Sequence, residues 1–237
     1  MKVLLFVRRS ILVIGVAVLV ALAAPAQADF INLPVKWSQP IVYDTNGVIL
    51  LFDLSSDHTI TGVKADDFIS DGRPIVAVRW WGSYIGETNQ RPDGFTFPFD
   101  ISFHLSDGAP HPTSLPSTLL ALYTVPAQEV FVGIDQGGDF VYRYDAFLPQ
   151  PFFETNSVEY FIDIDKPTGE KWGWHMTPIL TNDWAALAPG HFGPWASLTG
   201  DSLAFELMVP EPSTVLLAGI GLLGLWWCCK RQKTASG

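Results

Sequence analysis

Apolar and polar side chains alternate along several short stretches between residues 29 and 208. Ile101, Phe103 and Leu105 share one face of such a stretch, with polar neighbours between them. Residues 158–165 and 202–207 show the same period of two, which indicates half-buried β-strands. Further strands are predicted at residues 48–52, 75–81, 119–125, 129–134 and 140–147.

The pattern of short strands predicts an all-β fold. About eight to ten strands, separated by turns rich in Gly, Pro, Asp and Asn, are typical of a β-sandwich, a jelly roll or a barrel. A parallel sheet would need crossover helices, and no long stretch outside the two ends shows helical spacing. Residues 30–43 are interrupted by prolines and are expected at the surface or at a sheet edge. Residues 135–139 (Asp-Gln-Gly-Gly-Asp) are expected to form a hairpin turn. We therefore expect a single β-sandwich or jelly-roll-like domain over residues 29–208.

The charge of this region limits its partners. Residues 29–208 contain 8 Lys and Arg against 23 Asp and Glu, which gives a formal net charge of −15. Such a surface repels nucleic-acid phosphates, so nucleic acid is excluded as a partner. Both cysteines lie in the tail, so the region forms no disulfide.

Residues 1–28 have the parts of a secretory signal peptide. The positively charged residues are Lys2, Arg8 and Arg9. An apolar stretch follows at residues 11–24, and small residues precede a predicted signal-peptidase cleavage site between Ala28 and Asp29. The adjacent Arg8 and Arg9 leave a twin-arginine route open, but general secretion is favoured.

The tail, residues 209–237, combines a short apolar helix with a basic end. The predicted transmembrane helix spans residues 215–229, or about 22 Å, which is short for a bilayer core of about 30 Å. The basic residues after it are Lys230, Arg231 and Lys233. By the positive-inside rule they place the C-terminus in the cytoplasm and the domain on the outer side of the membrane.

Two prolines flank a glutamate just before this helix. Pro210 and Pro212 hold Glu211 in an extended conformation, which suits recognition by a membrane enzyme. The order of this motif, the helix and the basic end resembles the PEP-CTERM sorting signal of Gram-negative bacteria. The resemblance implies that an exosortase recognises Pro210, Glu211 and Pro212 and removes the helix. An ordinary single-pass anchor is the alternative, with the same topology.

The exported domain also resembles an uncharacterised β-rich family found in secreted PEP-CTERM proteins. The residues that carry this resemblance are 36–40 (Lys-Trp-Ser-Gln-Pro), 65–68 (Ala-Asp-Asp-Phe), 79–84 (Arg-Trp-Trp-Gly-Ser-Tyr) and 172–174 (Trp-Gly-Trp). It implies one β-rich module and carries no known activity.

Aromatic residues are the first candidates for a binding site, because seven of the nine tryptophans lie in the exported domain. The alternation places Trp80 with Val78 in the core and Trp81 with Arg79 on the other face. Flat rings stack on sugars, so the candidate glycan platform consists of Trp81, Tyr84, Trp172 and Trp174. The favoured alternative is that these rings fill the core.

Acidic residues offer a weaker candidate site. Asp163 and Asp165, at the start of a loosely loop-like segment, and the pair Asp66 and Asp67 are candidate Ca²⁺ ligands. The favoured alternative is a solvated acidic surface, so no cofactor is assigned.

No catalytic residue is predicted. The chain has neither G-x-S-x-G nor H-E-x-x-H, and its five histidines are scattered without metal-ligand spacing. We expect a non-enzymatic envelope or extracellular-matrix protein that passes through the inner membrane to the cell surface or the medium. A carbohydrate-binding module for extracellular polysaccharide is the alternative, and a polysaccharide hydrolase is a third.

Overall fold

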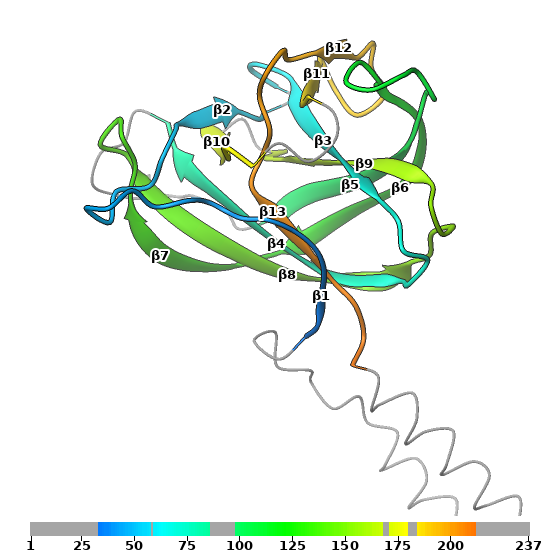
Figure 1. The fold of residues 1–237 in the computed structure, drawn as a ribbon, viewed down its shortest axis with the longest axis horizontal. Coiled ribbons are helices and arrows are strands. Elements are labelled where there is room, and N and C mark those ends of the chain that lie inside the picture. The colour runs from blue at the N-terminus through cyan, green and yellow to red at the C-terminus, as the bar shows by residue number, and fades with distance from the viewer. Residues whose placement is uncertain (1–32, 58, 86–97, 168–170, 180–183, 212–237) are drawn as a thin grey trace, which may run out of the picture. The chain divides into compact units, whose positions relative to one another are not determined.

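The computed structural model describes residues 33–57, 59–85, 98–167, 171–179 and 184–211 (Figure 1). These residues contain thirteen β-strands and no helix, which confirms the all-β prediction. Within the described ranges, accordingly, no helix has the length and apolar character needed to cross a membrane. Several predicted features lie outside these ranges: the signal peptide (1–28) with its Ala28–Asp29 cleavage site, Pro212, the helix at 215–229, and Lys230, Arg231 and Lys233.

The first sheet is built around one long strand, β4 (Ile75–Tyr84). The other strands of this sheet are β1 (Val35–Gln39), β2 (Asp53–Ser55), β7 (Gln128–Ile134), β8 (Phe140–Phe152), β10 (Trp172–His175) and β13 (Phe205–Met208). Strand β8 pairs along one edge of β4, and β7 pairs with β8. The other edge of β4 is shared, because β13 pairs with its first half and β10 with its second half.

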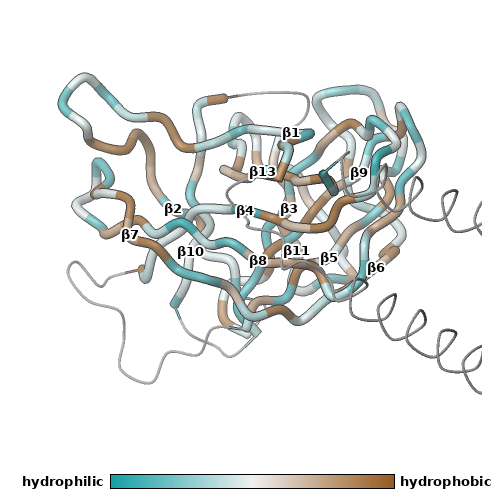
Figure 2. The backbone as a smooth tube through the Cα atoms, turned by 90° about the horizontal axis from the view of Figure 1, so that it is seen from below, coloured by the Kyte–Doolittle hydropathy of each residue, from teal (hydrophilic) through white to brown (hydrophobic). Residues whose placement is uncertain are grey.

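The second sheet has six strands in the order β12-β11-β3-β9-β5-β6. Their bounds are β3 (Val63–Ile69), β5 (Pro98–Ser106), β6 (Pro116–Pro126), β9 (Glu159–Asp165), β11 (Ala186–Ala188) and β12 (Ala196–Ser197). All strand pairs in both sheets are antiparallel. Hydropathy changes over short intervals along strands such as β8 (Figure 2), as expected where alternate side chains face opposite sides.

An aromatic core joins the two sheets. Phe99 of β5 lies against Trp80 of β4, Tyr144 of β8 and Trp172 of β10, with ring centroids 5.0–5.1 Å apart. Edge-to-face contacts of this kind add to the free energy gained by burying the rings. Because the contacts cross from one sheet to the other, the sheets pack face to face as in a β-sandwich, as predicted.

A second, smaller apolar cluster covers the opposite face of the first sheet. Trp81 and Val141 on that face pack against Ile41 and Ile49 from the segment between β1 and β2. Both faces of β4 are therefore covered. This explains why nearly the whole strand is buried, rather than every second residue.

One predicted strand is wrong. Residues 48–52 form no regular strand, because Ile49 makes only isolated bridges and Leu51 has a φ of 71°, which turns the chain. Residues 135–139 form the predicted hairpin turn between β7 and β8, closed by a hydrogen bond from the Asp135 N–H to the Asp139 carbonyl (3.0 Å). The segment with prolines contains β1, an edge strand of the first sheet, as predicted.

Candidate functional site

The four aromatic residues proposed as a glycan platform are all buried. Trp172 and Trp174 are 0% exposed, Tyr84 is 1% exposed and Trp81 is 6% exposed. An exposed platform made of these residues is therefore wrong.

Each ring is buried for an identifiable reason. Trp81 does face away from Trp80, as the alternation predicted, but the segment carrying Ile41 and Ile49 covers it. The Tyr84 hydroxyl donates to Glu129, and its ring packs on Tyr142. The indole N–H of Trp174 donates to the Ala204 carbonyl (2.8 Å) inside the core. These contacts place the rings inside the sandwich, where they stabilise the fold.

The Asp66 carboxylate connects the two sheets. Its Oδ2 accepts hydrogen bonds from the Gln39 side chain and the Leu203 N–H, both at 2.6 Å. Burial and the neighbouring charge of Asp67 raise the pKa of Asp66 well above its usual range. Because protein donors surround Asp66, this carboxylate ties β3 to β1 and to the segment before β13 and is not suited to hold Ca²⁺.

Asp163 and Asp165 belong to a buried cluster on the outer face of the second sheet, which we call the His191 cluster. Both aspartates lie in β9, not in a loop, and Asp165 pairs with Asp100 of β5. His191, from the segment between β11 and β12, lies over them. Its Nδ1 is 2.8 Å from Asp163 Oδ1, and its Nε2 is 3.3 Å from Asp165 Oδ1 and 3.9 Å from Asp100 Oδ2.

The His191 cluster also contains His104 and Ser102, both fully buried. His104 Nε2 lies 2.7 Å from Asp163 Oδ2 and 2.8 Å from Ser102 Oγ, and the Ser102 hydroxyl also donates to Asp163. In a Ser-His-Asp triad the hydroxyl and the carboxylate contact different ring nitrogens. Here both face the same nitrogen, so the geometry is not that of a catalytic triad.

Charge in the His191 cluster is balanced internally. Burial alone would raise the pKa of Asp163, but hydrogen bonds from His104 and His191 lower it. Burial opposes charge on His191, yet its bond to Asp163 and the charges of Asp163, Asp165 and Asp100 raise its pKa to about 9. The imidazolium therefore occupies the position where a cation would balance these carboxylates. The geometry does not favour Ca²⁺ at Asp163 and Asp165.

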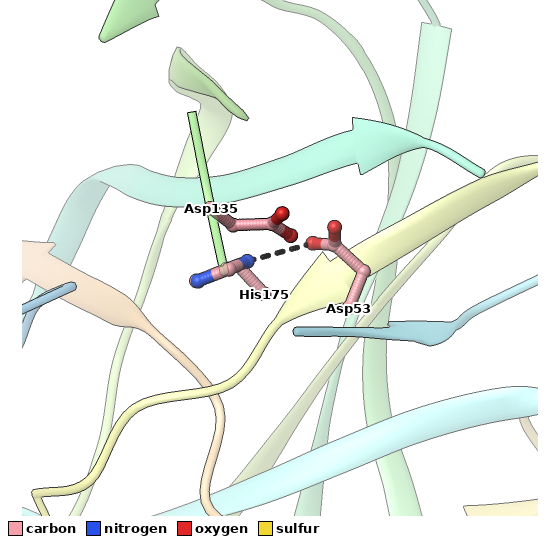
Figure 3. Close-up of side chains that lie close together, drawn as sticks. All are labelled: Asp53, Asp135 and His175. Atoms are coloured by element: carbon pink, nitrogen blue, oxygen red, sulfur yellow. Dashed lines mark hydrogen bonds and ion pairs between the residues drawn. The ribbon is translucent and has the colours of Figure 1, made fainter. Parts of the chain in front are cut away.

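A second cluster, which we call the His175 cluster, brings together Asp53, Asp135 and His175 (Figure 3). Asp53 begins β2, His175 ends β10, and Asp135 opens the turn between β7 and β8. Sequence reasoning missed this cluster, because Asp53 and His175 are 122 residues apart and Asp135 was assigned only a turn role. The sequence feature that could have pointed to this cluster is the position of His175 directly after the Trp-Gly-Trp motif.

Gly173 allows β10 and β2 to approach closely beside this cluster. A Cβ on Gly173 would lie 2.7 Å from Asp53 Cβ and 2.8 Å from Ile85 Cδ1. The glycine between the two tryptophans therefore helps to place Asp53 next to His175.

A β-sandwich whose last strand runs directly into a proline-flanked glutamate defines an exported β-domain protein with a C-terminal sorting signal. Residues 209–232 match the PEP-CTERM protein-sorting motif, which implies export, membrane transit and processing by an exosortase. Residues 35–216 match a family described as Domain of unknown function (DUF7901), and the chain belongs to this family. No curated protein and no solved structure matches the chain.

Proposed function

We propose that this chain is a non-enzymatic envelope or extracellular-matrix protein, displayed at the cell surface after its sorting tail is removed. The observation that carries the proposal is the position of the sorting motif, which begins at Val209, one residue after β13 ends. All thirteen strands of the described residues therefore precede the motif.

The last described contacts of the fold lie directly beside the start of the sorting motif. Val209 is 1% exposed, and its N–H donates to the Pro34 carbonyl (3.0 Å). Val35 pairs with Met208, so the first and last strands meet at one end of the domain (Figure 1). Cleavage beyond Glu211 would leave every strand pair intact, so the released domain would keep its fold.

One buried cluster that combines a serine, histidines and an aspartate is not arranged for nucleophilic catalysis. Ser102, His104 and Asp163 are closed to solvent and lack triad geometry. The strongly acidic composition favours a soluble domain in contact with solvent and ions outside the cell. The carbohydrate-binding alternative gains no support from Trp81, Tyr84, Trp172 or Trp174, because all four are buried.

Intact-mass analysis of cell fractions tests the proposal. The full chain is expressed in a Gram-negative host with and without the matching exosortase. We expect the surface or matrix fraction to contain a form that starts at Asp29 and lacks the tail helix, but only when the enzyme is present. Glu211→Ala should accumulate uncleaved in the inner membrane, because the recognised carboxylate is gone.

The matched control is Asp107→Ala, which removes an exposed carboxylate far from the tail in sequence and should be processed normally. A surface form that keeps Trp226 and Cys228 would show that the tail is a permanent anchor. A processed form confined to the periplasm would overturn the surface role while leaving the sorting step intact.

A further inference from the structure

Three side chains of the His175 cluster converge on one point although they come from three separate segments. One potential ligand atom each from Asp53, Asp135 and His175 lies within 4.8 Å of the other two. The side chain of His175 is 0% exposed and that of Asp53 4%, while Asp135 as a whole is 3% exposed. Figure 3 shows the Asp135 carboxylate pointing toward Asp53, with the imidazole beside both.

The other polar atoms of these side chains are held by neighbouring groups. His175 Nε2 lies 3.1 Å from the Leu50 carbonyl, and Asp53 Oδ2 accepts a hydrogen bond from the Ser83 hydroxyl. Asp135 Oδ1 accepts hydrogen bonds from the N–H groups of Gly137 (2.8 Å) and Asp139 (3.0 Å). Each side chain is thus oriented by one atom and presents another to the centre. Metal-binding histidines and carboxylates are held in this way.

One buried carboxylate oxygen at the centre is unsatisfied within the part of the chain that the structure describes. Asp135 Oδ2 is buried and has no hydrogen-bond partner among the described residues. An unsatisfied buried carboxylate oxygen is costly, and a second carboxylate, Asp53, lies beside it. Burial and the charge of Asp53 raise the pKa of Asp135, despite its backbone hydrogen bonds. A bound cation would satisfy this oxygen and offset the repulsion between the two carboxylates.

We propose that Asp53 Oδ1, Asp135 Oδ2 and His175 Nδ1 bind a divalent transition-metal cation of the Zn²⁺ class. Imidazole with carboxylates is a common Zn²⁺ ligand set, whereas Ca²⁺ and Mg²⁺ take six or more ligands that are mostly oxygen. Binding forms an Nδ1–metal bond and releases any proton on that nitrogen to solvent. The Nε2–H keeps its hydrogen bond to the Leu50 carbonyl. The cation would join β2, β10 and the β7–β8 turn as a structural crosslink.

The test measures Zn²⁺ content and melting temperature of the full chain purified in detergent. Cys228 and Cys229 are alkylated first, because thiolates also bind Zn²⁺. After EDTA treatment, gel filtration and Zn²⁺ addition at pH 8, we expect one Zn²⁺ per chain. The melting temperature should rise by at least about 5 °C, because the ion binds only the folded state. X-ray absorption should show only N and O ligands at about 2.0–2.1 Å.

Asp135→Asn is the decisive variant. Its amide oxygen can still accept the hydrogen bonds from Gly137 and Asp139, so the turn is retained while the charged oxygen is lost. We expect Zn²⁺ affinity to fall at least about tenfold and the temperature rise to disappear. Asp107→Asn is the matched control, because Asp107 Oδ1 accepts a similar turn hydrogen bond from Ala109 N–H (2.9 Å) and its variant should bind as the wild type does.

Two further results would overturn the proposal. The first is a wild-type chain that retains no Zn²⁺ and shows no temperature rise, since the cluster would then be a self-contained ion pair. The second is loss of Zn²⁺ in Asp165→Asn but not in Asp135→Asn, which would move the ion to the His191 cluster. If Asp135→Asn fails to fold, X-ray absorption of the wild-type protein still decides whether the Zn²⁺ is bound by N and O ligands alone. Sulfur ligands in that spectrum would overturn the proposal.

Discussion

The His191 cluster and the His175 cluster both combine aspartates with histidine, but these side chains have different partners in each. In the His191 cluster, one carboxylate oxygen of Asp163 is hydrogen-bonded to His191 and the other to His104. Both oxygens therefore have a partner within the protein. In the His175 cluster, one carboxylate oxygen of Asp135 accepts backbone hydrogen bonds. The other oxygen has no donor among the described residues. The partners of Asp163 and Asp135, and not the number of acidic residues, therefore distinguish the two clusters.

The difference follows from where each histidine lies. His191 belongs to the segment between β11 and β12, which lies over the outer face of the second sheet and brings an imidazolium to carboxylates that already share that face. His175 is fixed at the end of β10, where the backbone carbonyl of Leu50 holds one of its nitrogens. That leaves only Nδ1 of His175 to face carboxylates, whereas both ring nitrogens of His191 face them.

Replacing Asp163 should have the largest effect. In Asp163→Asn the charged partner of both His191 and His104 is lost, so we expect the free energy of unfolding to fall by about 3–5 kcal/mol. Asp135→Asn, measured in EDTA, should cost less than about 1 kcal/mol, because its turn hydrogen bonds persist. Urea denaturation of both variants measures these losses in the free energy of unfolding. Equal losses would contradict the proposed difference between the two clusters.

Adding a methyl group at Gly173 should disturb only the His175 cluster. Gly173→Ala forces β10 and β2 apart, because the new Cβ would lie 2.7 Å from Asp53 Cβ. We expect a loss of about 1–3 kcal/mol in stability together with weaker Zn²⁺ binding. Gly190→Ala is the control, because no atom lies within 4 Å of its added Cβ. A Gly173→Ala protein with wild-type stability and Zn²⁺ affinity would contradict the account of this close approach.

The His191 cluster should make stability depend on pH. The folded protein raises the pKa of His191 from 6.5 to about 9, so its contribution is complete below pH 6.5 and is lost as the pH rises through 9. Since the ring is not fully shielded from solvent, we expect a loss of about 1–2 kcal/mol. Urea denaturation from pH 6 to pH 9.5 in EDTA should show a larger loss in the wild type than in His191→Gln, because His175, whose pKa the nearby Asp53 raises against the effect of burial, adds a loss in both proteins. An equal loss in both would assign it to other groups.

The smallest effect is expected at Asp100. Its Oδ2 lies 3.9 Å from His191 Nε2, while its Oδ1 accepts a hydrogen bond from Thr124 (2.6 Å) that an asparagine can also accept. Asp100→Asn should therefore lower the pKa of His191 slightly and cost about 0.5 kcal/mol or less. A large loss of stability would mean that Asp100 holds the cluster together more directly than this distance indicates.

The sequence predicted the class of fold because side-chain alternation is a local property. The alternation assigned Trp80 and Trp81 to opposite faces, and the structure agrees. It could not show that residues 41–49 fold back over the face of Trp81, because that cover comes from chain far away in sequence. The failure at residues 48–52 has the same origin, since Ile49 is buried in the cluster that covers the first sheet while making only isolated bridges.

The candidate sites were less accessible to sequence reasoning. Asp163 and Asp165 were singled out as candidate Ca²⁺ ligands, yet their partner His191 lies 28 residues from Asp163 and only the fold brings it there. Asp53, Asp135 and His175 meet only because β2 pairs with β10 at the register that places Asp53 opposite His175. Strand register across more than 100 residues cannot be obtained from one sequence by periodicity.

Histidine NMR of the full chain, with and without one equivalent of Zn²⁺, tests the contrast between the two clusters most directly. We expect the His191 ring to titrate near pH 9 in both samples, and only the His175 ring signals to shift on addition of Zn²⁺. Zn²⁺-dependent shifts at His191 with His175 unchanged would contradict this expectation.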